Sequence, residues 1–262
     1  MSGGSATADS PLPLESPRFT SAPAGVAAWT TTRAGGVSSA PYDTLNLGAA
    51  VGDDSVRVRE NRRRAAAAMG FDLASAALVR QVHGAGIVCA DAATAGRGLV
   101  TEAAIPDADA LVTDVRGLAL IVGMADCVPV FLAAADGRAI ALAHAGWRGV
   151  VADVVPRTLE ILSARYGVLP SETVAAFGPS IGPCCFEVGE DVASVFASRF
   201  PGSARNRRVD LAAALRRQLA DAGVPREAPS PPCTRCHADR YFSHRAAGGI
   251  PSGRMWAVLR RL

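Results

Sequence analysis

The 262-residue chain has 49% hydrophobic residues, 19% charged residues and a formal net charge of +3, a composition that predicts a globular protein with a sizeable core and excludes a disordered chain. So small a charge gives no reason to expect a nucleic acid or a membrane surface as a partner. All 27 residues of the Lys and Arg class are arginine, which excludes Schiff-base catalysis by lysine and a P-loop lysine.

The first 22 residues form a predicted disordered tail, and residues 23–262 are expected to form a single catalytic domain. The tail has neither a basic n-region nor an apolar h-region, so it does not resemble a secretory signal. No apolar run reaches the roughly 18–20 residues needed to span a bilayer. We therefore expect a cytoplasmic protein whose six cysteines are reduced.

Short apolar runs bounded by Gly, Asp and Pro predict buried strands, and apolar residues at helical spacing predict helices. The predicted strands cover residues 26–32, 77–82, 86–90, 119–122, 128–134, 139–143, 173–177 and 254–259. A first predicted helix has N-cap candidates at 53, 54 and 55 and runs through residue 68, and the other predicted helices cover residues 150–166, 190–200 and 210–222. We expect 86–90 to return beside 77–82 as a tight pair. Pro156 must lie in a first helical turn or kink its helix.

Three side chains that can bind a metal stand at the ends of predicted strands: His83, Cys127 and His144. Two imidazoles and one thiolate with an open fourth position suit a catalytic zinc, which lowers the pKa of bound water toward 7. A rival arrangement makes Cys127 a nucleophile and His144 its base. Either residue alone could also be a buried core residue.

Two arginines and one asparagine are candidates for binding substrate. Arg33 precedes a glycine turn, and its guanidinium fork matches phosphate or carboxylate, although an ordinary surface turn is the simpler reading. Arg148 follows a glycine turn and could complete a phosphate cradle. Asn46 is either a turn residue or a ligand contact. The arginine run at 62–64 is most simply a solvated helix face.

The motif CTRCH at 233–237 matches a c-type haem attachment pattern, but no export signal accompanies it. A structural zinc site would need four ligands, and His244 is the only nearby addition at suitable spacing. Cysteines adjacent in sequence, such as Cys184 and Cys185, rarely form a disulfide with each other, because the geometry is strained. We expect these two to be packing residues or to line a surface. We therefore expect an ordinary loop at 233–237, whose cysteines and histidine are dispensable for chemistry.

Several motifs occur in order along the chain and together resemble the laccase-domain family. They are TTRAGGVS, NLG, RQVHG, DADALVTD, ADCVPV, HAGWRG and GPSIGPCCFEVG, followed by DLAAAL and FSHR. Members of that family have been called polyphenol oxidases, multifunctional purine nucleoside phosphorylases and peptidoglycan editing factors. The resemblance implies an α/β (α+β) fold, a single domain of layered helices around mixed β-sheets. It also implies a zinc site at His83, Cys127 and His144, with Arg33 near the site as a phosphate ligand.

Physical chemistry ranks these family activities. A multicopper laccase needs many histidine ligands, and this chain has four histidines. Phosphorolysis needs a phosphate cradle, which Arg33 and Arg148 could supply, and a base pocket, which the loop near Cys184 could wall. Deamination of adenosine needs zinc-activated water. Of the activities that the resemblance implies, we therefore expect a zinc-dependent purine nucleoside phosphorylase acting on adenosine, inosine, guanosine and methylthioadenosine, with adenosine deaminase activity.

Two other functions stay open. A cysteine amidase that edits peptidoglycan precursors would use Cys127 and His144 without a metal. A non-enzymatic zinc-containing binding module would fold and bind zinc without turnover. The expected partners are purine nucleosides and phosphate, and the sequence makes no prediction of the oligomeric state.

Overall fold

The computed structural model describes residues 12–101, 103, 105–226 and 228–262, and the strands in these ranges form two five-stranded sheets and one small ribbon. The first sheet has the order β1 (Leu14–Glu15), β2 (Val26–Thr31), β12 (Met255–Arg261), β6 (Ala119–Met124) and β3 (Ala76–Leu78). The second has the order β4 (Ile87–Cys89), β5 (Ala110–Thr113), β8 (Ile140–Ala145), β7 (Val128–Ala134) and β9 (Thr173–Phe177). The ribbon pairs β10 (Ala204–Arg205) with β11 (Arg208–Val209). Each large sheet combines one parallel pair with antiparallel pairs, so the predicted mixed sheets are confirmed.

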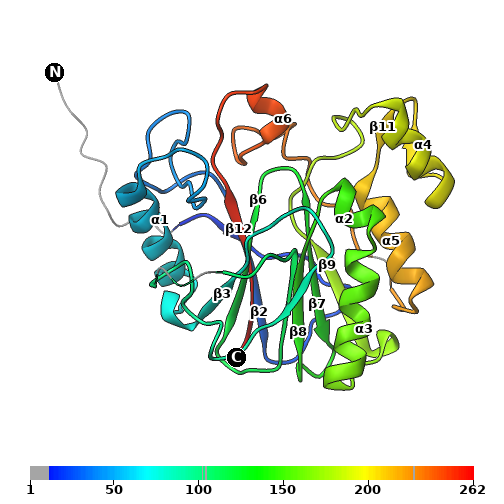
Figure 1. Ribbon diagram of the computed structural model, residues 1–262, viewed down its shortest axis with the longest axis horizontal. Coiled ribbons are helices and arrows are strands. Elements are labelled where there is room, and N and C mark those ends of the chain that lie inside the picture. The colour runs from blue at the N-terminus through cyan, green and yellow to red at the C-terminus, as the bar shows by residue number, and fades with distance from the viewer. Residues whose placement is uncertain (1–11, 102, 104, 227) are drawn as a thin grey trace.

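Helices cover the outer faces of both large sheets. The helices of the described ranges are α1 (Ser55–Ala68), α2 (Trp147–Val151), α3 (Val154–Tyr166), α4 (Glu190–Arg199), α5 (Leu211–Asp221) and α6 (His244–Ala247), with short 3-10 turns at Leu73–Ser75 and Pro170–Glu172. In Figure 1, α1 lies beside the first sheet, and α3 and α5 lie on the opposite side of the molecule, against the second. The layers therefore run helix, sheet, sheet, helices, as the predicted fold class requires.

The central strands are buried on both faces, which explains their unbroken apolar sequences. In β7, Val130 and Leu132 pack against the helical layer, whereas Phe131 and Ala133 pack into the core between the two sheets. Successive side chains of a strand point to opposite faces. A strand enclosed on both faces therefore needs apolar residues at every position instead of an alternating pattern.

The predicted tight pair of 77–82 and 86–90 was wrong. Strand β3 pairs in parallel with β6 in the first sheet, and β4 pairs in parallel with β5 in the second. Strand β3 forms an edge of the first sheet and β4 forms an edge of the second, and each pairs with a strand more distant in sequence. The connection through His83 therefore crosses from one sheet to the other, and this crossing carries His83 to the place where the sheets meet.

The predicted helix over 150–166 is split in two. Helix α2 ends before Asp153, whose φ of 62° is left-handed, and α3 begins at the next residue. Pro156 lies in the first turn of α3, where its missing N–H would have no intrahelical partner in any case. The helices predicted at 190–200 and 210–222 are present as α4 and α5, with Asp210 capping α5 through Ala213 N–H at 2.9 Å.

Part of the segment 1–22, which is predicted to be a disordered tail, has a defined place in the structure, and residues 1–11 lie outside the described part. Leu14 and Glu15 pair with Thr31 and Thr30 as an edge strand. The Tyr241 hydroxyl also donates to the Glu15 carboxylate at 2.7 Å. Within the described ranges, no helix is both long and apolar enough to cross a membrane.

Candidate metal centre and active site

Three metal-competent side chains from three separate segments meet at one end of the sheets. His83 lies between β3 and β4, Cys127 lies between β6 and β7, and His144 belongs to β8. Their ligand atoms all lie within 4.8 Å of one another, and the two imidazole rings are edge to face with centroids 5.0 Å apart. The structure therefore brings together the three residues that sequence analysis placed in one site.

A buried carboxylate, Asp109, orients two members of this group. Asp109 Oδ1 lies 3.0 Å from His144 Nδ1 and accepts the His83 backbone N–H at 3.0 Å, and Asp109 Oδ2 accepts the Gly84 N–H at 2.6 Å. Because Asp109 engages Nδ1, Nε2 of His144 remains as the ring nitrogen for a ligand. Metal-ligating histidines are commonly held in this way by a carboxylate behind the ring.

The charges of these groups are coupled. Burial alone would raise the pKa of the Cys127 thiol, but His144 and His83 beside it lower that pKa to about 6. Burial would lower the pKa of His144, but the Cys127 thiolate and the Asp109 carboxylate raise it to about 9. Without a metal, the site at neutral pH therefore pairs a thiolate with an imidazolium. The thiolate is the form of cysteine that binds metals and acts as a nucleophile.

Two residues beside the sulfur have left-handed backbones. The φ angles of His83 and Asp126 are 59° and 96°. Such conformations cost about 1–3 kcal/mol each outside glycine and persist where the surroundings impose them, often at functional sites. The Asp126 carboxylate accepts the Thr234 hydroxyl at 2.6 Å and the Arg245 backbone N–H at 2.7 Å. These contacts hold the turn that presents Cys127.

Gly146 leaves space for the ligand cluster. A Cβ at this position would lie 2.9 Å from Cys127 Sγ and 3.3 Å from His83 Cδ2. No side chain fits there without displacing the sulfur. The glycine after His144-Ala145 is therefore required by close approach, and its absent side chain is part of the geometry of the site.

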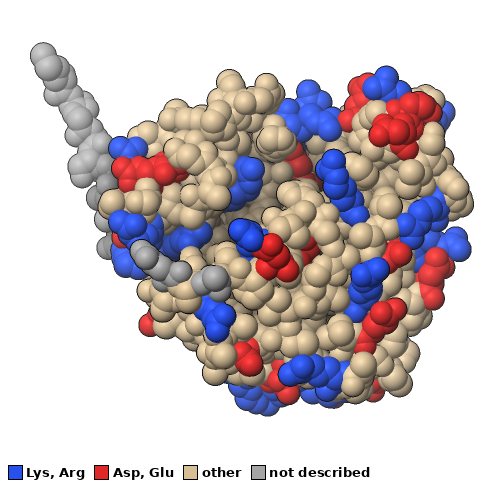
Figure 2. Space-filling model, viewed as in Figure 1, with Lys and Arg blue, Asp and Glu red and all other residues tan. Residues whose placement is uncertain are grey.

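The cluster opens into a cavity of about 700 Å³, a size typical of small-molecule sites. Its apolar lining includes Leu47, Val79, Ile105, Ile181, Phe186 and Trp256, and its basic lining comprises Arg62, Arg80, Arg148, Arg245 and Arg254. Figure 2 shows a hollow near the middle of the molecular face with basic side chains at its border. Such walls suit a ligand that combines a flat apolar part with an anionic part.

The profile of the multi-copper polyphenol oxidoreductase laccase family matches residues 27–261. The chain belongs to this family. Its predicted membership of the laccase-domain family is therefore confirmed. The crystal structure of YlmD from Geobacillus stearothermophilus has a TM-score of 0.85 to this chain, at 37% identity over 91% of this chain and 92% of that one.

Curated relatives of this laccase-family chain are named as enzymes of purine nucleosides. The purine nucleoside phosphorylase YlmD of Geobacillus stearothermophilus is 38% identical over 250 residues, which cover 91% of each protein. The purine nucleoside phosphorylase SCO2081 of Streptomyces coelicolor is 41% identical and covers 86% of this chain and 93% of its own. The adenosine deaminase RL5, from an unknown prokaryotic organism, is 35% identical and covers 95% and 99%. These names support an enzyme of this kind.

The donor set suits one metal ion better than the several coppers in the name of the laccase family. Among the described residues, two groups of His, Cys, Asp or Glu side chains are close enough to hold a metal. Only the group at His83, Cys127 and His144 contains histidine. Two imidazoles, one thiolate and an open side toward the cavity fit zinc, and a copper ion would also accept such donors.

The two predicted phosphate ligands have different surroundings in this laccase-family member. Arg148 is exposed and lines the cavity, with its guanidinium 4.3 Å from the centroid of the Trp147 ring system. Arg33 lies outside the described lining of the cavity. Its guanidinium donates to the backbone oxygens of Asp43 at 3.0 Å and Ala238 at 2.7 Å. The structure therefore does not bring Arg33 to the site, because it fastens two loops together instead.

Asn46 is buried and forms hydrogen bonds to the backbone of residues that line the cavity. Its side-chain oxygen accepts the backbone N–H groups of Gly48 at 3.0 Å and Arg254 at 2.9 Å, and its amide donates to Asp53 at 2.9 Å. Of the two roles considered for Asn46, the turn residue agrees with these contacts. It positions Arg254, which does line the cavity.

Three residues of the site are not among those predicted from the sequence. Asp109 stands directly before a buried strand in the DADALVTD motif, a signal that could have marked it. Arg254 lines the same cavity as Cys127 and His144, and burial lowers the pKa of its guanidinium. Arg62 was expected on a solvated face, but it is buried and donates to the backbone of Leu47 at 2.9 Å.

Proposed function

We propose that this chain is a zinc-dependent purine nucleoside phosphorylase that also deaminates adenosine, with adenosine, inosine, guanosine and methylthioadenosine as phosphorolysis substrates. The observation that carries the proposal is the opening of the His83, Cys127 and His144 cluster into a cavity lined by both apolar side chains and arginines. The names of the curated relatives support the same substrate class.

In this proposal, His83, Cys127 and His144 hold the zinc, and Asp109 keeps His144 in the required orientation. Zinc bound there would act as a Lewis acid and make hydroxide available from water near neutral pH. The low pKa of Cys127 supports the assignment because a thiolate at neutral pH needs no further proton loss to become a ligand.

Other residues that line the cavity are assigned to different parts of the substrates. Phosphorolysis joins a phosphate oxygen to C1′ of the ribose and breaks the bond from C1′ to the base, while the departing purine takes up a proton. Arg148 and Arg254 are assigned to the phosphate, because both line the cavity and, in a chain without lysine, guanidinium groups are the side chains that carry a permanent positive charge. Phe186 and Ile181 offer the base an apolar wall.

A second candidate is a cysteine amidase that edits peptidoglycan precursors. It is favoured by one specific feature, the Cys127 thiolate beside the His144 imidazolium, which is the arrangement of a nucleophile and its acid–base partner. This reaction would need no metal. The two candidates therefore differ in their response to metal removal.

The experiment measures purine release from inosine and adenosine at varied phosphate, ammonia release from adenosine, and the zinc content of the same protein. We expect purine release to require phosphate and both activities to fall when a chelator removes the metal. His83→Ala and Cys127→Ala should lose the metal and both activities together.

Matched controls use residues of the same type away from this cluster. His237→Ala and Cys89→Ala should keep zinc at the cluster and both activities, because neither residue contributes to it. Purine release that does not depend on the phosphate concentration would overturn the phosphorylase proposal. So would the failure of metal-loaded protein to release purine in the presence of phosphate. Amide hydrolysis that persists in the metal-free protein and disappears in Cys127→Ala would favour the amidase.

A further inference from the structure

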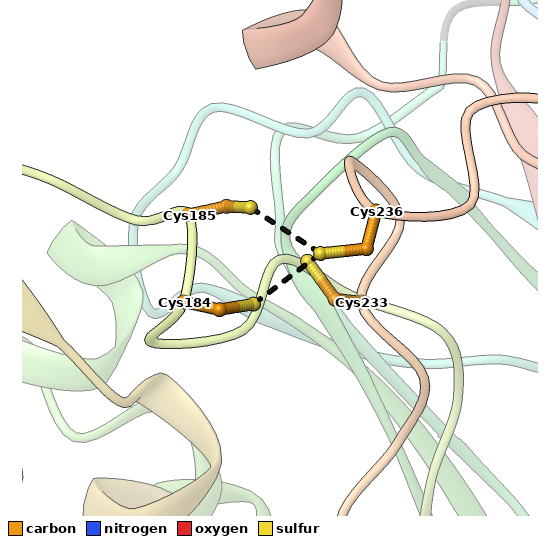
Figure 3. Close-up of side chains that lie close together, drawn as sticks. All are labelled: Cys184, Cys185, Cys233 and Cys236. Carbon is orange, nitrogen blue, oxygen red and sulfur yellow. Dashed lines mark hydrogen bonds between the residues drawn. The ribbon is translucent and has the colours of Figure 1, made fainter.

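Four cysteines from two distant loops meet at a second place in the fold. Cys184 and Cys185 follow β9, and Cys233 and Cys236 lie between α5 and α6. Figure 3 shows their side chains converging from the two loops on one point. The Sγ atom of Cys236 is 3.5 Å from that of Cys184 and 3.5 Å from that of Cys185, and all four sulfurs lie within 4.8 Å of one another.

This convergence corrects the sequence-based reading of both segments. From the sequence alone, the CTRCH motif is expected to be an ordinary loop, because only His244 is near enough in sequence to complete a ligand set. The structure supplies Cys184 and Cys185 from a segment about fifty residues away. The set then consists of four thiols, and neither His237 nor His244 belongs to it.

Hydrogen bonds between backbone groups join the two loops in this arrangement. Ser180 N–H donates to Pro232 O at 3.2 Å, and Thr234 N–H donates to Ser180 O at 3.0 Å. The Gly182 N–H points at Cys233 Sγ, 3.3 Å away, and a Cβ on Gly182 would lie 3.3 Å from Cys184 Sγ. The loops are thus pre-organised around the sulfur cluster, and Gly182 stands where its backbone comes close to the sulfurs.

The spacing of the sulfurs matches a metal better than it matches disulfides or packing. All four cysteines are free. In a tetrahedral zinc site with Zn–S bonds of about 2.3 Å, neighbouring sulfurs stand roughly 3.8 Å apart, which the cluster approaches. Packing is a weak explanation because Cys184 and Cys236 are exposed.

The surroundings carry the charge that such a site needs. Four thiolates around a divalent ion leave a net charge of about −2. Arg207, Arg208 and Arg235 line the surface hollow next to Cys185, and Arg208 donates to the Cys184 carbonyl. Arg207 and Arg208 also lie 3.8 and 4.0 Å from the Glu187 carboxylate, so their positive charge is shared between that carboxylate and the thiolates. Guanidinium groups do not compete with the thiolates as metal ligands.

We propose that Cys184, Cys185, Cys233 and Cys236 bind a second zinc ion as a tetrathiolate site. Four protein ligands fill the tetrahedral coordination shell and leave no position for water or substrate, which is typical of structural zinc. This site shares no residue with the His83, Cys127 and His144 cluster. The proposal does not depend on the proposed enzymatic function.

The position of the cluster gives the second zinc a specific role. It joins the loop that carries Ile181 and Phe186, two lining residues of the cavity, to the loop that carries Thr234. The Thr234 hydroxyl donates to Asp126, which precedes Cys127. The metal would therefore fix one wall of the cavity and the turn that presents the Cys127 sulfur.

The test compares the metal content of the full-length chain with that of variants of each site. Wild type should contain two zinc ions, and Cys127→Ala should contain one. Cys233→Ser/Cys236→Ser should also contain one, with a lower thermal unfolding temperature. In the Cys127→Ala background, cobalt should give the intense absorption of thiolate-to-cobalt charge transfer, and the added pair Cys233→Ser/Cys236→Ser should abolish it.

A measurement on protein with all four cysteines avoids dependence on variants that fail to fold. Titration of zinc-loaded Cys127→Ala with a mercurial thiol reagent should release one zinc as about four thiols react. Zinc-free Cys127→Ala after expression with excess zinc, or cysteines paired as disulfides by mass, would overturn the proposal. Iron in place of zinc would overturn the choice of metal. Activity is not a readout here, so failure of the enzymatic proposal would leave these results interpretable.

Discussion

The Asp109 carboxylate lies 3.0 Å from Nδ1 of His144, and both side chains are buried. The contact joins the first residue before β5 to the penultimate residue of β8, two strands that pair in antiparallel register. It determines which ring nitrogen of His144 is available to a ligand. The same carboxylate accepts backbone N–H groups from the His83 segment, so one acidic residue holds the imidazole of His144 and the backbone that carries His83.

Asp109→Asn should weaken metal binding at this cluster. Loss of a carboxylate behind a metal-ligating histidine typically costs about 10- to 100-fold in metal affinity, because the ring loses its orientation and basicity. The measurement is zinc affinity by competition with a chromophoric chelator. Asp114→Asn, an exposed change at the end of the same strand, is the control and should leave the affinity unchanged.

Alkylation of Cys127 in metal-free protein should follow a pH profile displaced to the acid side. With a pKa of about 6, the thiol is protonated below that pH and becomes a reactive thiolate as the pH rises through it. We expect the rate of modification by iodoacetamide to reach half its plateau near pH 6. His144→Ala should move this midpoint upward, because the neighbouring positive charge is lost. A wild-type midpoint near the ordinary value for cysteine would contradict the ion pair.

Gly146→Ala should damage the cluster without unfolding the chain. The added Cβ would lie 2.9 Å from Cys127 Sγ, so the sulfur must move away from the position that meets both imidazoles. We expect a loss of zinc and at least about a tenfold loss of activity, with secondary structure by circular dichroism unchanged. Gly84→Ala in the neighbouring loop is the control, because its Cβ would meet nothing closer than 3.7 Å. Equal zinc content in the two variants would contradict the steric argument.

Arg148→Ala should raise the KM for phosphate, whereas Arg33→Ala should not. A charge-assisted hydrogen bond contributes about 1.5–3 kcal/mol, which corresponds to roughly 10- to 150-fold in affinity. Arg33 instead holds Asp43 and the Ala238 carbonyl, so its loss should lower stability by about 1 kcal/mol, or the unfolding temperature by roughly 2–4 °C. Phosphate kinetics and thermal unfolding of both variants check the assignment. A raised KM in Arg33→Ala alone would restore the sequence-based expectation.

Local patterns were sufficient to predict most elements of this fold. The unbroken apolar run at Val128–Ala134 predicts a strand enclosed on both faces, and the structure places it between helices and the facing sheet. Asp210 and the helical spacing after it predict α5. These features depend on periodicity and capping within a few residues, which a single sequence displays directly.

The meeting of the first cluster could also be anticipated, because His83, Cys127 and His144 lie at strand ends in motifs shared with a known family. The positions of the arginines could not. Arg33 and Arg148 both neighbour glycine turns in sequence, yet one fastens two loops and the other lines the cavity. Nothing local distinguishes them, because the difference lies in which distant carbonyl oxygens each guanidinium meets.

The sequence by itself determined most of the strands and helices, through patterns that repeat within one turn or one pleat, but it did not predict β5 (Ala110–Thr113) or the break between α2 and α3. The ligand types of the first cluster followed from its motifs. Only the tertiary structure decided that β3 and β4 belong to different sheets and that Cys184 and Cys185 meet Cys233 and Cys236. Both outcomes bring together segments distant in the chain. Such contacts form because the free energy gained by packing the whole core offsets the conformational entropy lost in closing long loops. The spacing of residues within a short segment does not reveal this difference in free energy.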